Sequence, residues 1–179
     1  MPNVIYWKFA KPVAAKPETR FSDKELREMQ LNVYRAERKN PDIKESAAIE
    51  AAHRTIRAEF EIRRAILPFG KRDEHPQRGI MSLYGFDAGK KSKLTKEARD
   101  EKLDFIYFVE LLPIWSKTYM RSWGLPGTRQ RLEAMRGLIQ SQIKSHEYDR
   151  DYADAVRDWY ESLDYLGEIW KHAPRRARW

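Results

Sequence analysis

The 179-residue chain contains no cysteine. This absence excludes disulfide bonds, thiolate metal sites, iron–sulfur clusters and a cysteine nucleophile. No apolar run approaches the roughly 20 residues that a membrane-spanning helix needs, and the first residues lack the charged lead and apolar stretch of a signal peptide. We therefore expect a soluble, cytoplasmic protein with no membrane partner.

Large apolar side chains and charged side chains are both abundant. The chain is 41% hydrophobic, 12% aromatic and 35% charged, and it includes six tryptophans. This content of large apolar residues is too high for wholesale disorder, and the length suits one domain. We predict a single helical domain over residues 22–174. An extended arm over 1–21, in which two Ala-Lys-Pro triplets favour extended backbone, precedes it, and a basic tail over 175–179 follows.

Helix-start signals recur along the chain. Residues 22–25, Ser-Asp-Lys-Glu, form a capping box that predicts the first helix. Asn40-Pro41 ends that helix and begins the second, with asparagine as N-cap and proline at the first helical position. Thr95 and Thr128 begin the third and fourth predicted helices, and a fifth follows His146. Together with the spacing of apolar residues, these signals predict an all-α five-helix bundle.

The third predicted helix is apolar around most of its circumference between residues 103 and 112. Such a helix belongs at the centre of a bundle, and Pro113 should kink or restart it before Trp123. Glu110 interrupts the apolar run. A carboxylate buried there must be paired or have a raised pKa. A structural pair with an arginine or a tyrosine hydroxyl is favoured over a catalytic role.

Residues 68–93 show no sustained hydrophobic period and combine glycines with lysines and arginines. Loops of this length are uncommon in compact domains and tend to be functional. The short apolar run at 80–84 is expected to anchor the loop to the core as a helical turn or a strand. This long basic loop is therefore the first candidate for a contact surface.

A polyanion-binding surface is the best-supported function in the sequence. Its predicted residues are basic side chains of the second helix, the long loop and the tail: Arg54, Arg57, Arg64, Lys71, Arg72, Arg78, Lys90, Lys91, Lys93, Arg175, Arg176 and Arg178. Phosphate binding needs surface cations but little sequence precision, because released counterions supply much of the affinity. The plainest alternative is an ordinary solvated face. We predict a non-enzymatic protein that binds nucleic acid or a nucleoprotein complex, with DNA and RNA both open because no known recognition signature is present.

Charge is distributed unevenly along the chain. Residues 147–168 hold eight acids and two bases, a net charge of −6, which leaves +14 on the rest of the chain. The alternative function is therefore a protein–protein adaptor or inhibitor, homo-oligomeric if the acidic helix of one copy meets the basic remainder of another. Its predicted interface residues are Asp154, Asp158, Glu161 and Trp179. The acidic helix can equally meet basic residues of its own subunit, and this is the alternative to an interface.

Two further patterns carry little weight. Residues 85–92 lack one residue between the glycines of a phosphate loop and place lysine where serine or threonine should stand. Glu50 and His53 have the Glu-x-x-His spacing of di-iron bundles, but the second copy that such a site needs is missing. A helical enzyme that uses Glu110 or the Glu50/His53 pair is the least favoured hypothesis. No metal or cofactor is expected.

Overall fold

The computed structural model describes residues 19–66, 79–114 and 116–172, and every regular element within them is helical. Seven α-helices and two 3-10 helices lie in these residues: α1 (Asp23–Lys39), η1 (Pro41–Glu45), α2 (Ala47–Ile66), α3 (Ile80–Leu83), α4 (Lys96–Phe108), α5 (Lys117–Ser122), α6 (Arg129–His146), η2 (Arg150–Tyr152) and α7 (Ala153–His172). The all-α class is thus confirmed for this part of the chain. Several predicted features lie outside the described residues: the arm up to residue 18, Lys71, Arg72, Arg78 and the tail 175–179 with Trp179.

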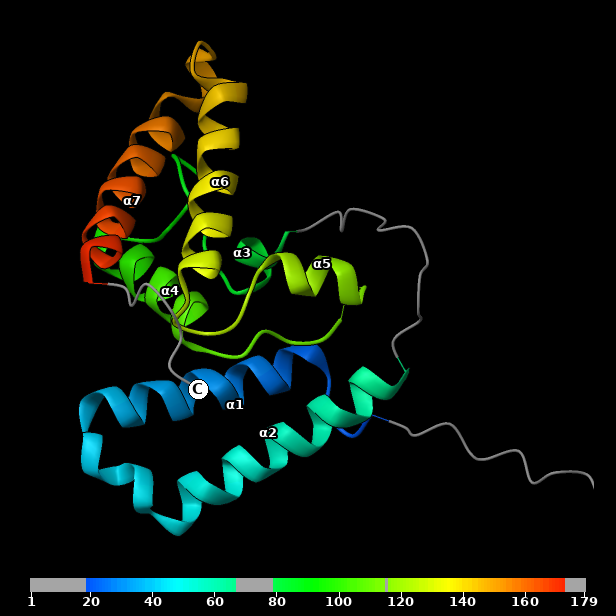
Figure 1. The fold of residues 1–179 in the computed structure, drawn as a ribbon. Helices are drawn as coiled ribbons and strands as arrows, with labels where there is room; N and C mark the ends of the chain where they lie inside the picture. The colour runs from blue at the N-terminus through cyan, green and yellow to red at the C-terminus, as the bar shows by residue number, and fades with distance from the viewer. Residues whose placement is uncertain (1–18, 67–78, 115, 173–179) are drawn as a thin grey trace, which may run out of the picture.

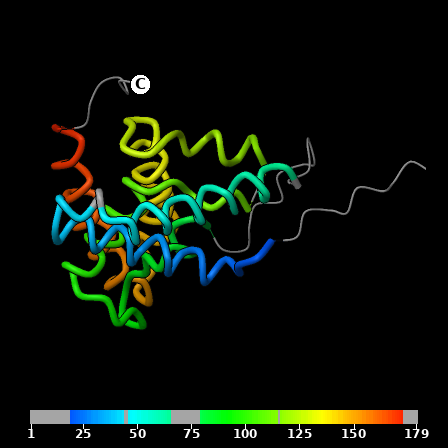
Figure 2. Tube along the Cα trace, turned by 90° about the horizontal axis from the view of Figure 1, so that it is seen from below, coloured from blue at the N-terminus to red at the C-terminus, as the bar shows by residue number. Residues whose placement is uncertain are grey.

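Two helical hairpins cross each other. The helices α1 and α2 run antiparallel along one side of the molecule, and α6 and α7 form a second antiparallel pair at a steep angle to them (Figure 1). The helix α4 packs on α7, and two ion pairs, Arg35 with Glu101 (2.8 Å) and Arg38 with Asp104 (2.6 Å), join it to α1. Figure 2 shows α1 and α2 side by side from below. The arrangement is therefore two crossed hairpins with α4 between them rather than one aligned bundle.

The predicted helix starts are confirmed where a side chain caps the backbone. The Ser22 hydroxyl accepts a hydrogen bond from Glu25 N (3.2 Å), and Ser22 N donates to Glu25 Oε2 (2.8 Å), which completes the capping box. These bonds to Ser22 hold the pKa of Glu25 below its ordinary value. The hydroxyls of Thr95 and Thr128 likewise each accept from the backbone N–H three residues on (3.3 Å in both helices).

Two predicted helix boundaries are wrong. Asn40 caps the short 3-10 helix η1, and α2 begins only at Ala47. The third predicted helix ends at Phe108 instead of continuing to Leu112, and residues 109–114 are not helical. Pro113 explains part of this second difference, because a proline disfavours helical backbone in the residue before it.

Tertiary contacts account for the rest of the early end of α4. The side chain of Gln30 donates to the Glu110 carbonyl (2.7 Å), and Leu112 N donates to the buried hydroxyl of Tyr84 (2.8 Å). Two backbone groups of this segment are therefore bonded to distant side chains instead of to a continued helix. Tyr84 belongs to the apolar run at 80–84, where Ile80 is also fully buried, so the predicted anchoring of that run as a helical turn is confirmed. Burial raises the pKa of Tyr84 above its ordinary range.

Candidate anion-binding cleft

The basic residues predicted to bind a polyanion lie in separate places. Arg54 and Arg57 are exposed on α2, which packs on α1. The lysines of residues 90–93 are exposed in the segment before α4, and a hydrogen bond from Gly89 N to Asp158 Oδ2 (2.8 Å) holds this segment against α7 near its start. Figure 1 shows α2 and the start of α7 at opposite ends of the molecule. The structure therefore does not join these cations into one surface.

Arg64, near the end of α2, borders a hollow of about 420 Å³ that we call the basic cleft. Its lining brings together basic side chains from three helices: Arg64, Lys117, Arg121 and Arg131. Its apolar side chains are Leu111, Pro113, Met120, Leu125 and Pro126. Among the residues that the structure describes, Glu110 is the single carboxylate in this lining. The hollow therefore combines an excess of positive charge with an apolar wall.

Arg131 is a buried cation whose partners are backbone carbonyls. It is 2% exposed, and its guanidinium donates to the carbonyl oxygens near the C-terminal ends of α4 and α5: Ile106 (2.8 Å), Val109 (3.1 Å), Trp123 (2.9 Å) and Gly124 (2.7 Å). A cation suits these positions because the C-terminus is the negative end of a helix dipole. Burial lowers the pKa of Arg131 to about 10, which leaves it charged at neutral pH. No carboxylate in the described part of the chain pairs with it, so its charge adds to the positive potential of the cleft.

Three cations of the basic cleft are absent from the predicted site residues. For Arg131 a signal existed, because it lies four residues before Met135 and hence on the apolar face of α6, where a cation needs special partners. Lys117 and Arg121 are one turn apart on α5. Nothing in the sequence indicates that this turn lies opposite the end of α2.

Glu110 lies between the basic cleft and a second hollow, because it lines both. Its carboxylate forms an ion pair with Arg64, and its side chain is 49% exposed. The prediction of a buried carboxylate is therefore wrong, since α4 ends before this residue and the chain turns it outward. Arg64 also pairs with Glu61 on its own helix. Arg121, by contrast, has no ion-pair partner within the described ranges.

The second hollow, which we call the neutral cleft, measures about 460 Å³ and lies between α1, α2 and the residues that end α4. Its lining is mixed: Gln30, Val33, Tyr34, Glu37, Arg38, His53, Ile56, Arg57, Phe108, Val109 and Glu110. Arg38 donates to the Tyr34 hydroxyl (3.0 Å) as well as to Asp104. Arg57 has no ion-pair partner among the described residues. It is therefore the cation of this lining that is free to meet a ligand.

The Glu-x-x-His pattern does not form a site. His53 Nε2 lies 2.8 Å from Glu37 Oε1 on α1, whereas Glu50 is an exposed residue of α2. Across residues 19–66, 79–114 and 116–172, no group of three or more histidines and carboxylates is placed to hold a metal ion. The spacing on α2 thus reflects helical periodicity alone.

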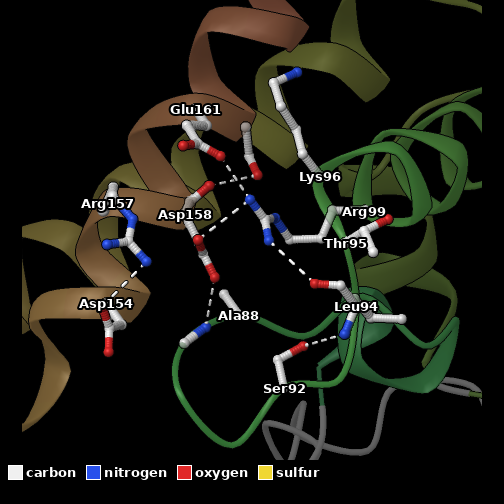
Figure 3. A network of polar contacts seen from close by, with 12 residues as sticks. Ala88, Ser92, Leu94, Thr95, Lys96, Arg99, Asp154, Arg157, Asp158 and Glu161 are labelled. Carbon is white, nitrogen blue, oxygen red and sulfur yellow. Dashed lines mark hydrogen bonds and ion pairs between the residues drawn. The ribbon is translucent and has the colours of Figure 1, made fainter.

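All three acidic residues predicted for a protein interface have an ion-pair partner within the chain (Figure 3). Arg99, which is 5% exposed, donates to Glu161 Oε2 (2.6 Å) and lies 3.2 Å from Asp158 Oδ1. Asp154 pairs with Arg157 on the same helix (3.1 Å), and both of these side chains are largely exposed. The charge complementarity of the acidic helix is therefore partly satisfied inside one subunit.

The chain matches no protein-family model, no curated protein and no solved structure. None of the helices in the described residues combines the length and the apolar character needed to cross a membrane. What the two clefts bind is therefore inferred from their own chemistry.

Proposed function

We propose that the protein is a non-enzymatic nucleic-acid-binding protein whose contact surface is the basic cleft together with Arg57 on α2. The observation that supports this function is the cluster of four cations around one hollow, against a single carboxylate in the described part of its lining. Guanidinium groups bind phosphate oxygens through paired N–H donors. Clustered cations also displace the counterions that are condensed on DNA or RNA, which supplies much of the binding free energy.

The positions of the arginines on α2 extend the cluster beyond the cleft. Arg57 and Arg64 are seven residues apart, so they lie on one face and about 10 Å apart along the helix axis. Three further cations, Lys71, Arg72 and Arg78, follow Arg64 in the sequence. A polyanion that follows α2 thus meets positive charge over more than one phosphate.

Fluorescence anisotropy with labelled DNA and RNA oligonucleotides tests this function. Arg57→Glu and Arg121→Glu should each weaken binding about tenfold and reduce the slope of log K against log salt by about one. Arg150→Glu is the matched control, because Arg150 is exposed in η2 at the far end of α6. It should change the affinity less than about twofold, since exposed charges beyond a Debye length are screened.

Two results would reject the function. One is a protein that binds neither DNA nor RNA even at about 50 mM salt, where electrostatic binding is strong. The other is an equal loss of affinity in Arg150→Glu and in the two cleft variants, since binding would then depend on net charge and not on the cleft.

A second candidate function, a self-associating protein adaptor, is favoured by exposed tyrosines in the turn after α6 and on α7. Tyr148 is 93% exposed and Tyr160 is 47% exposed within the acidic segment. Exposed aromatic side chains are typical anchors of protein interfaces, and the basic surface of a second copy supplies the opposite charge. Sedimentation at micromolar concentration should then detect an assembly that Tyr148→Ser dissociates. A monomer at all concentrations rejects this candidate.

A further inference from the structure

The two clefts lie next to each other but differ in charge. Both are lined by Glu110. In the neutral cleft, Arg38 and Arg57 are balanced by Glu37 and Glu110 among the described residues, whereas the basic cleft has an excess of cations. A nucleotide has the same two parts, a flat uncharged base and an anionic phosphate. The pair of clefts therefore fits a ligand in which uncharged bases alternate with anionic phosphates better than it fits a uniformly charged ligand.

Phe108 supplies an aromatic surface at the neutral cleft. It is 55% exposed although it is the last residue of α4 and the five residues before it are buried. The Tyr107 ring packs against it edge to face, with the centroids 4.7 Å apart and the planes at 66°. This contact orients the Phe108 ring while more than half of the residue remains open to solvent. An exposed ring beside cations is the arrangement that single-strand-binding proteins use to stack bases.

We propose that the paired clefts bind single-stranded nucleic acid, with an unpaired base stacked on Phe108 and the adjoining phosphates on Arg57 and Arg64. This inference rests on the proposed function and specifies its substrate class. The bases of a duplex are paired and stacked on each other, so they cannot reach a ring inside a cleft between two helices. A phosphate that approaches Arg64 must compete with Glu110, which holds that guanidinium in the free protein.

The hydrogen-bonded pair of Glu37 and His53 lies in the same cleft and offers polar groups to a base edge. Such groups form hydrogen bonds with the exposed Watson–Crick edge of a splayed base. Base stacking is tolerant of sequence, because every base has an aromatic face. We therefore expect binding of single strands with little sequence preference.

The test compares oligo-dT and oligo-U strands of about 16 nucleotides with a DNA duplex and an RNA duplex of the same length, by fluorescence anisotropy. The unmodified protein should bind the single strands more tightly than the duplexes. Phe108→Ala should weaken single-strand binding about 5- to 150-fold, which corresponds to a stacking contribution of about 1–3 kcal/mol. Its effect on duplex binding should stay below about twofold, because no base of a duplex reaches the ring. Phe108→Trp should retain the affinity.

Tyr152→Ala is the matched control. Tyr152 is 41% exposed and its ring also contacts one neighbouring ring, that of His146, but it lines neither cleft. Because both side chains are exposed, neither substitution removes a core residue. Tyr152→Ala should leave single-strand binding within about twofold, since its ring lies outside the proposed site.

The outcomes separate this inference from the function on which it rests. If duplexes bind as tightly as single strands, or if Phe108→Ala and Tyr152→Ala have equal effects, the single-strand inference is wrong. The proposed function stands in that case as long as Arg57→Glu and Arg121→Glu still weaken binding. If no nucleic acid binds at all, both are wrong.

Discussion

Removing Arg99 from the buried ion pair between α4 and α7 should lower the free energy of unfolding. Arg99→Met keeps much of the side-chain volume but removes the guanidinium. The Asp158 side chain, 11% exposed, then retains the hydrogen bond from Gly89 N (2.8 Å) without a cation beside it. A buried carboxylate that has lost its cation destabilises the folded state by about 3–5 kcal/mol. We therefore expect the free energy of unfolding to fall by about that amount and Tm to fall by roughly 6–20 °C for a chain of this length.

Urea unfolding followed by tryptophan fluorescence measures the loss. Arg157→Met is the matched control, because Arg157 also pairs with an aspartate of α7 (3.1 Å), but the two side chains are 65% and 45% exposed. Such an exposed pair contributes about 0–1 kcal/mol. Adding Asp158→Asn to Arg99→Met should recover part of the stability, because it removes the unpaired charge. If Arg99→Met lowers the free energy of unfolding no more than Arg157→Met does, the Asp158 carboxylate is solvated and its burial does not explain the stability of the pair.

Three further changes have defined expected results. A side-chain hydrogen bond from Arg35 holds the pKa of Glu101 below its ordinary value. The ionised carboxylate therefore stabilises the folded protein fully at a pH above its ordinary pKa, and this stabilisation is lost as the pH falls through the lowered pKa. Arg35→Met should therefore make the free energy of unfolding in urea fall less steeply between about pH 5 and pH 3. Glu110→Gln removes one of the two carboxylates that pair with Arg64 and takes a negative charge out of the cleft, so the affinity for nucleic acid measured by anisotropy should rise about two- to tenfold. Gly89→Ala places a Cβ 2.8 Å from a side-chain carbon of α7 at a φ of +91°, and it should lower the free energy of unfolding by about 1–3 kcal/mol.

Each of these changes has a control on an exposed part of the chain. Lys24→Met, whose ion pair with Glu28 is exposed and 3.9 Å long, should not alter the acid dependence. Glu133→Gln on the exposed face of α6 should change the affinity for nucleic acid less than about twofold. Gly137→Ala adds a methyl group in open space and should stabilise α6 by about 0.5–1 kcal/mol. Equal behaviour of a variant and its control would contradict the corresponding prediction.

The helix starts at Ser22, Thr95 and Thr128 can be read from the sequence because a capping hydroxyl and the N–H that it binds are three residues apart. The burial of the run at 80–84 is equally local, since its apolar side chains have no exposed conformation of comparable free energy. The excess of acids in residues 147–168 can be counted directly from the sequence. These features depend on neighbours in the chain, so the helical class and the distribution of charge follow from the amino-acid sequence alone.

Which partners those charges meet depends on the tertiary structure. Arg99 and Glu161 are 62 residues apart, and Arg64 and Glu110 are 46 residues apart. The early end of α4 also depends on a distant residue, because Arg131 of α6 caps its last carbonyls. A helical pattern shows which face is apolar but not which helix lies against it. The sequence therefore determined where positive charge is abundant, and the packing of the helices decided which cations remain unneutralised beside a hollow.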